Sequence, residues 1–330
     1  MADGKWISEL TALTPVADAA RRVLTVRFEV VHHYLPLAVR EAAKDPEYVH
    51  QLRVGTRRAG AALLIFRDHL PDKEYRQARR ELRKIRRAAG EARDWDVFLL
   101  ALMDKHRQAP SRQRPGLDCL IGTALARREL AQANLAETGP DYPFILERLQ
   151  ADTVAAIRNP HGRTVYTLGQ LARPMLASLL AELDEAVARD LDDYTQLHRV
   201  RIIGKRLRYA MEVFADCFDS SFKDQLYPAV EEMQEILGNA NDSHVAAQRL
   251  TELRDALRKS WPEAWKRFRS GIEGLLRFHL RRLPQERKRF LAWWKTWQES
   301  GGENVFASLV NELRFNHRPI SAPRTNRTAK

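Results

Sequence analysis

The sequence predicts an all-α protein made of two similar helical bundles. Residues that start and end helices recur along the whole chain, whereas the two-residue alternation and composition typical of strands are missing. Key residues also recur at a constant spacing of 148 positions, without gaps. A repeat of this length predicts an internal duplication, with a first repeat over 12–158 and a second over 160–306. The recurring pairs are His50 and His198, Arg53 and Arg201, Arg57 and Lys205, Arg58 and Arg206, Phe66 and Phe214, Gly90 and Gly238, Asp94 and Asp242, and Val97 and Val245.

Capping residues, prolines and glycines divide the first repeat into helices. Asp45 and Pro46 supply an N-cap and a proline at the first helical position, and Gly90 supplies a helix stop that Asp94 follows as the next N-cap. We therefore expect helices over about 15–44, 45–69, 71–90 and 94–108, a fifth that ends at Gly139 and Pro140, and a linker at 159–162.

The second repeat follows the same plan. Gly238 is expected to end a helix and Asp242 to cap the next one, with later boundaries at Trp261-Pro262 and Pro284. Two further prolines, Pro174 and Pro228, could kink or delay a helix. A second interpretation of the aspartates is compatible with capping: Asp94 and Asp242 hold the Arg or His side chains of the neighbouring helix in place.

Composition restricts the partner and the compartment. The chain has 55 Lys and Arg against 43 Asp and Glu, a formal charge of +12, which favours a polyanion or an anionic membrane surface. Cys119 and Cys217 have neither metal-type nor redox-type spacing and are expected to be buried thiols in a reducing compartment. No apolar segment suits a signal peptide or a spanning helix, so we expect a cytoplasmic protein. Residues 314–330 read as a basic, disordered tail.

The predicted second helix carries the first candidate binding group. His50, Arg53 and Arg57 share one face, opposite an apolar face that includes Leu52 and Leu63. A single histidine more commonly packs between helices or bonds a carboxylate, and that alternative stays open for each one. The same i, i+3, i+7 spacing in both repeats favours a shared role facing an anion. The second repeat supplies His198, Arg201, Lys205 and Arg208.

The predicted third helix carries an arginine stripe. Its charges repel one another, and Glu81 and Glu91 cannot neutralise all of them, so an extended polyanion would stabilise it. Arginine is also the residue best suited to bidentate oxygen recognition. Alternatively, the stripe is a solvated face beside acidic helices of the second repeat. The corresponding segment there is acidic, so the first repeat is expected to carry more of the binding. The stripe comprises Arg76, Arg79, Arg80, Arg83 and Arg87, with Lys84 and Arg86 at its flanks.

The segments from His50 to Arg58 with Phe66, and from Gly90 to Val97, resemble the CHAD domain, the conserved-histidine α-helical domain. The copy from His198 to Phe214 and from Gly238 to Val245 resembles its second half, and together the likeness covers about residues 12–306. It implies two similar bundles around a pseudo-two-fold axis, with a basic central cavity or surface that binds inorganic polyphosphate and targets the protein to polyphosphate granules. The residues that carry over are His50, Arg53, Arg57, Arg58, His198, Arg201, Lys205 and Arg206.

Two positions depart from exact repetition, because Lys205 corresponds to Arg57 and His244 to Asp96. Lysine still binds phosphate but lacks the guanidinium fork.

Motifs of catalysis are missing from the sequence. It has no Glu-x-Glu-x-Lys triad of the CYTH type, no Walker loop, no His-Glu-x-x-His pair and no Gly-x-Ser-x-Gly elbow. We therefore expect a stand-alone CHAD domain that binds polyphosphate without catalysis, cofactor or metal. One alternative is a metal-dependent phosphoanhydride hydrolase with His50, His198, Asp94 and Asp242 as ligands. Another is a general binder of nucleic acids or other polyanions.

Overall fold

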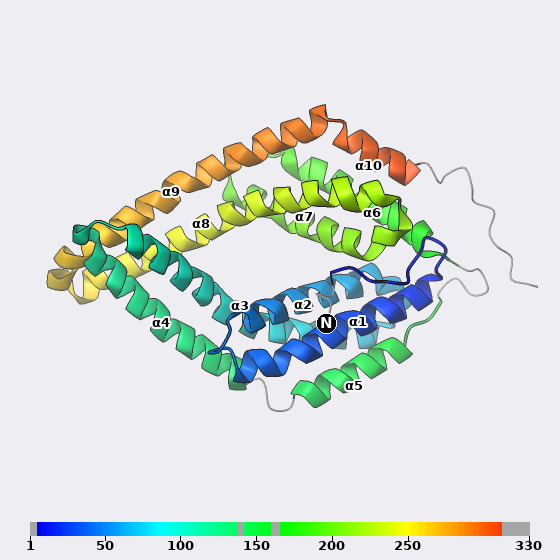
Figure 1. Ribbon diagram of the computed structural model, residues 1–330, viewed down its shortest axis with the longest axis horizontal. Helices are drawn as coiled ribbons and strands as arrows, with labels where there is room; N and C mark the ends of the chain where they lie inside the picture. The colour runs from blue at the N-terminus through cyan, green and yellow to red at the C-terminus, as the bar shows by residue number, and fades with distance from the viewer. Residues whose placement is uncertain (1–4, 138–141, 160–165, 312–330) are drawn as a thin grey trace, which may run out of the picture.

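The computed structural model describes residues 5–137, 142–159 and 166–311 (Figure 1). Within these residues every regular element is helical and no strand occurs, apart from one isolated bridge between Pro15 and Thr167. The predicted all-α fold class is therefore confirmed. Residues 160–162 of the expected linker at 159–162, the helix end at Gly139-Pro140 and the basic tail at 314–330 lie outside the described residues.

The described residues form ten α-helices, five in each half of the chain. The duplication itself and the boundaries of its repeats stay predictions, because an equal number of helices does not establish a common origin. The first half contains α1 (Val16–Arg40), α2 (Glu47–Ile65), α3 (Asp72–Gln108), α4 (Arg114–Glu137) and α5 (Tyr142–Ala155). The second half contains α6 (Leu168–Val187), α7 (Tyr194–Phe214), α8 (Tyr227–Ser260), α9 (Pro262–Glu299) and α10 (Gly302–Asn311).

Two long helical hairpins extend from the body of the molecule as arms. The α3–α4 arm and the α8–α9 arm meet at their tips, at the left of Figure 1, where α4 packs against α9. The two helices approach each other closely there. A Cβ on Gly116 would lie only 2.3 Å from the carbonyl oxygen of Phe268. A Cβ on Gly271 would lie 2.2 Å from the carbonyl oxygen of Gln113. The two glycines therefore permit the contact that closes the arms into a ring.

Apolar side chains form one main core and a smaller core between the arms. The main core includes residues of both halves, for example Phe28 and Leu52 with Val200 and Phe214, all fully buried. Its members on α2 and α7 lie on the faces that the sequence predicted to be apolar. The arm core includes Phe98, Leu102, Leu120, Leu250 and Ile272.

The predicted helix breaks at Gly90 and Gly238 are wrong. Helix α3 continues from Asp72 to Gln108 and α8 from Tyr227 to Ser260, so Asp94 and Asp242 lie inside helices and cap nothing. A glycine inside a helix costs about 1 kcal/mol relative to alanine. Long-range packing of α3 against α2 outweighs this local preference, since the carbonyl oxygen of Gly90 accepts a hydrogen bond from Arg53 at 3.0 Å.

The expected boundary at Pro284 is also wrong, because α9 runs through it to Glu299. Pro174 likewise lies inside α6, whereas Pro228 occupies the first turn of α8, where a helix tolerates proline. The boundary at Trp261-Pro262 is confirmed. Both cysteines are free thiols, and Cys217 is buried whereas Cys119 is partly exposed. None of the described helices is long and apolar enough to cross a membrane.

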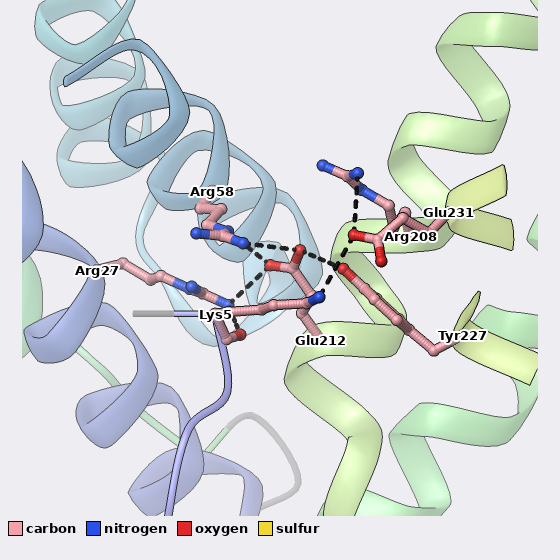
Figure 2. A network of polar contacts seen from close by, with 7 residues as sticks. All are labelled: Lys5, Arg27, Arg58, Arg208, Glu212, Tyr227 and Glu231. Carbon is pink, nitrogen blue, oxygen red and sulfur yellow. Dashed lines mark hydrogen bonds and ion pairs between the residues drawn. The ribbon is translucent and has the colours of Figure 1, made fainter. Parts of the chain in front are cut away.

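A buried ion-pair network joins the two halves (Figure 2). Arg58 on α2 donates two hydrogen bonds to Glu212 on α7, from Nε at 2.8 Å and from Nη2 at 3.2 Å. Arg27 on α1 donates to the same carboxylate at 3.4 Å, and the Tyr227 hydroxyl donates to it at 3.0 Å. Because these side chains come from four helices, the network fixes α2 and α7 relative to each other.

Candidate functional site

Two connected hollows lie between the halves and share four residues. The shared residues are Arg53 and Arg57 of α2 with His198 and Arg201 of α7, and we call these four the waist. The bundle hollow, of about 560 Å³, lies on the side of the bundle cores and has further lining residues on α2, α3 and α7. The arm hollow, of about 590 Å³, lies on the side of the arms and has further lining residues on α3, α8 and α9. The first half therefore contributes two arginines to the place where the hollows join, and the second half contributes an arginine and a histidine.

The two waist arginines at corresponding positions are held differently. Arg53 Nη1 donates to the Gly90 carbonyl at 3.0 Å and forms an ion pair with Asp94. The Nε of Arg201 is buried without a hydrogen-bond partner among the described residues. Asp242 favours the charged form of Arg201, but burial outweighs it and lowers the pKa of Arg201. Asp94 thus forms an ion pair to the neighbouring helix, which is the contact that its expected orienting role requires.

Lys205 and the three waist arginines form a cluster of basic side chains. Lys205 lines the bundle hollow, and its burial, together with Arg201, Arg57 and Arg53, lowers its pKa to about 6. The pKa of Arg57 is also lowered, mainly by burial, and its Nε has no hydrogen-bond partner among the described residues. Like charges in a desolvated space raise the free energy of the ligand-free state. A bound anion would lower that free energy.

The two histidines line the arm hollow in different surroundings. His50 has a lowered pKa because of burial and the nearby Arg93. His198 also has a lowered pKa, because of burial and then Arg201, and its Nδ1 lies 3.4 Å from the Tyr194 hydroxyl. In the absence of an anion both imidazoles therefore favour the neutral form near pH 7. His198 shows part of the structural alternative, a histidine fixed by its neighbours, although it also lines both hollows.

Helix α3 supplies one wall of the bundle hollow through part of the predicted arginine stripe. Arg79, Arg83 and Arg86 line it, and burial together with Arg83 lowers the pKa of Arg86. The other members lie away from both hollows. Arg76 pairs with Asp72 at 2.8 Å, Arg80 and Lys84 pair with Glu81 at 2.9 and 3.1 Å, and Arg87 is exposed to solvent.

Three other predicted site residues are paired with carboxylates. Arg58 is buried in the network with Glu212 and lines neither hollow. Arg206 lines the bundle hollow, but its Nη1 donates to Glu182 at 2.6 Å. Arg208 lies outside both hollows, with Nη1 3.7 Å from Glu231, although its charge still contributes to the lowered pKa of Lys205.

Comparisons with known proteins fit this architecture. A family model described as CHAD domain matches residues 22–251, well over half of the chain. The chain belongs to the CHAD domain family. No CYTH domain is evident in the described residues. No curated protein sequence matches the chain.

Two solved structures show the same fold. The crystal structure of the CHAD domain from the plant Ricinus communis is similar with 26% identity and a TM-score of 0.67, over 87% of this chain and 96% of that one. The structure of PptA from Streptomyces chartreusis has 17% identity and a TM-score of 0.67, over 86% of this chain and all of that one. The likeness to PptA shows the fold alone.

Several residues of the CHAD cavity were missed by sequence reasoning. Arg93, Lys105, Arg249 and His279 line the arm hollow but were not predicted as site residues. Arg93 follows Arg86 by seven positions, so it continues the α3 stripe once the helix is read through Gly90. The wrong helix break therefore concealed Arg93, whereas no repeat or motif marked Lys105, Arg249 or His279.

The histidines and aspartates of the CHAD cavity are not gathered into a group of metal ligands among the described residues. Among the described residues, no group of three or more His, Cys, Asp or Glu side chains is placed to hold a metal ion. His50, His198, Asp94 and Asp242 all line the arm hollow but do not form such a group. Asp94 is instead paired with Arg53.

Proposed function

We propose that this chain binds inorganic polyphosphate in its two connected hollows. The observation that carries the proposal is the waist, where Arg53 and Arg57 of one half and Arg201 of the other line both hollows at once. Charge-assisted hydrogen bonds from guanidinium groups to phosphate oxygens would hold the polymer. Membership of the CHAD family, which is linked to polyphosphate, supports this choice among polyanions.

The arrangement of charge suits a chain of phosphates better than a single one. The cations continue from the waist along α3 through Arg79, Arg83 and Arg86 on one side, and to Arg93 and Lys105 on the other. A polymer with one charge on every repeating unit can contact both hollows and the waist together, whereas a single phosphate can occupy only one position. Multiple contacts along one ligand also raise affinity without requiring any single strong site.

We further propose that the protein acts by binding and not by catalysis, and that it is found on polyphosphate granules because it follows its ligand. The described cavity offers hydrogen-bond donors at Arg57, Arg201 and Lys205, which suit phosphate recognition. It offers no group of metal ligands among the described residues to activate a water molecule.

A titration of two matched double variants tests the proposal. Arg57→Gln with Arg201→Gln removes two guanidinium groups from the waist. Arg199→Gln with Arg267→Gln removes the same charge from exposed positions that line neither hollow. Because each charged hydrogen bond contributes roughly 1.5–3 kcal/mol, we expect the waist variant to bind long-chain polyphosphate about 100-fold more weakly or worse. The control variant should lose only the small part of the polyphosphate affinity that arises from the net charge of the protein.

The same titration separates the alternatives. Long-chain polyphosphate and duplex DNA are compared at matched charge and salt, with and without magnesium or manganese, while released phosphate is measured. Polyphosphate affinity should fall steeply with salt, by analogy with counterion release from nucleic acids. Equal affinity for DNA would establish a general polyanion binder, and metal-dependent phosphate release would establish a hydrolase. Equal losses in the two double variants would remove the waist from the binding site.

A further inference from the structure

The two hollows differ in chemistry although they share the waist. In the bundle hollow, cationic side chains outnumber the aliphatic ones. In the arm hollow, the cations are joined by a continuous set of apolar side chains on α3, α8 and α9. These are Val97, Phe98, Ala101, Leu102, Val245, Ala246 and Leu275. The apolar set belongs in part to the arm core, so its position is fixed by packing.

Inorganic polyphosphate does not explain these apolar walls. Its oxygens are charged and strongly hydrated, and placing them against aliphatic and aromatic carbon removes water without supplying hydrogen bonds. A concave site that combines apolar walls with placed polar groups is instead typical of an organic ligand, and 590 Å³ lies in the usual range for one. The walls therefore fit a ligand that combines phosphates with a flat or apolar group.

His279 on α9 supplies a second, independent observation at the apolar end. Its Nδ1 is buried and has no hydrogen-bond partner among the described residues. Burial, together with Arg282 and Lys105, lowers the pKa of His279 to about 4, so the imidazole is neutral at pH 7. A buried polar atom without a partner is costly, and a neutral ring that can donate or accept matches the edge of a heterocycle better than a phosphate.

Arg249 on α8 adds a planar surface to the same hollow. Its guanidinium lies over the Trp95 ring at 4.2 Å from the centroid and donates to the Asp94 carbonyl at 2.9 Å. The side chain is thus held with a defined plane. Guanidinium planes and aromatic rings are the surfaces on which proteins stack nucleobases.

We propose that the arm hollow binds nucleoside 5′-polyphosphates, with the base at the apolar end beside His279 and the phosphates directed to the waist. This ligand class goes beyond inorganic polyphosphate and rests on the apolar walls and His279, which the polymer does not use. The two ligands share the waist cations and would therefore compete.

The test compares ATP with inorganic tripolyphosphate, which has a phosphate chain of the same length but no base, at one pH and salt concentration without divalent cations. We expect ATP to bind about tenfold more tightly, the gain expected from burying part of a base against apolar walls. Ala101→Phe fills the apolar end from an exposed helical position and should remove that preference. Leu100→Phe, one residue away on α3 and outside the hollow, should keep it.

His279→Ala provides a second variant that leaves the volume of the hollow open. It should reduce the preference for ATP several-fold and leave tripolyphosphate affinity unchanged, because the imidazole contacts only the base. Equal affinity of wild-type protein for ATP and tripolyphosphate would overturn the proposal, as would a full ATP preference in Ala101→Phe. If the wild-type protein prefers ATP to tripolyphosphate but does not bind long-chain polyphosphate, the proposed function is overturned and the nucleotide site is retained.

Discussion

Helices α3 and α8 face the cavity from opposite halves, yet they carry different charges at corresponding positions. Arg79, Arg83 and Arg86 of α3 line the bundle hollow. The residues 148 positions later on α8 are Tyr227, Glu231 and Gln234. Tyr227 donates to Glu212, and Glu231 pairs with Lys5 and Arg208. One helix thus presents its charges to the hollow, whereas the other uses the same positions to fix neighbouring elements.

Arg58 of α2 and Arg206 of α7 also occupy corresponding positions but have different partners. Arg58 crosses to the other half and pairs with the fully buried Glu212. Arg206, at the corresponding position of α7, pairs with Glu182 inside its own half, and both of these side chains are about two-fifths exposed. Similar sequence positions can therefore serve an internal junction in one half and a solvated contact in the other.

The largest expected effect is a loss of stability when the buried carboxylate between the halves is removed. Glu212→Gln leaves the buried Arg27 and Arg58 without their carboxylate, and removing one partner of a buried ion pair costs about 3–5 kcal/mol. We expect a corresponding fall in the free energy of unfolding, measured by urea denaturation followed by circular dichroism. Glu182→Gln breaks a partly exposed pair and should cost only about 0–1 kcal/mol. Equal losses in the two variants would contradict the distinction between junction and surface.

The next effect concerns binding and separates the cavity wall from the predicted stripe. Arg83 and Arg87 are both exposed arginines on α3, one turn apart, but only Arg83 lines the bundle hollow. Arg83→Glu should weaken polyphosphate binding by about tenfold or more, because a charged hydrogen bond is replaced by repulsion. Arg87→Glu makes the same change in net charge and should have a much smaller effect. Similar losses, measured by titration, would favour the whole stripe as the binding surface.

Local pattern predicted the helical faces well. The 3.6-residue period placed His50, Arg53 and Arg57 on one face of α2 and the buried Leu52 and Leu63 on the other, because both faces belong to one helix. The assignment of these cations as phosphate-binding groups stays a prediction.

Contacts between distant segments could not be predicted in the same way. The partner of Arg58 is 154 residues away in the other half, and no periodicity reveals such a pair. Gly90 was misread because its local preference to end a helix is outweighed by packing of α3 on α2 and by the hydrogen bond from Arg53. His279 reaches the hollow only because the two arms meet, which depends on the close contact of α4 with α9.

A smaller effect on stability is expected at Lys205, which lines the bundle hollow at the position that corresponds to the waist residue Arg57. Its folded-state pKa of about 6 lies far below its ordinary value of 10.5, so the unfolded chain binds more protons between these values. The contribution of Lys205 therefore makes the folded state less stable as the pH falls from 10.5 towards 6. Lys205→Met should raise the free energy of unfolding at pH 7 by about 1 kcal/mol, measured by urea denaturation without ligand.

The same variant should bind polyphosphate several-fold more weakly, because the lysine can no longer become charged beside the anion. Arg199→Met, at an exposed position of α7, is the control and should change neither property appreciably. A Lys205→Met variant less stable than the wild type would show that the buried amine does not destabilise the cavity.

The smallest effect is a proton taken up on binding. Burial and then four arginines, Arg201, Arg57, Arg53 and Arg208, lower the pKa of Lys205, and a bound polyanion offsets the arginine charges and raises that pKa. At pH 8.5 the free amine is neutral and becomes protonated in the complex, so affinity should fall as the pH rises from 6 towards the pKa of the bound state. Calorimetry at pH 8.5 in buffers of different ionisation enthalpy should detect up to about one proton per site.

Lys205→Arg makes this position identical to Arg57 of the first half and gives the matched comparison. A guanidinium stays charged at pH 8.5, so the variant should bind polyphosphate without taking up that proton. His50 and His198 also have lowered pKa values, but their ordinary value of 6.5 places most of their uptake at lower pH. If Lys205→Arg takes up as many protons as the wild type at pH 8.5, the coupled proton belongs to another group and Lys205 is not its source.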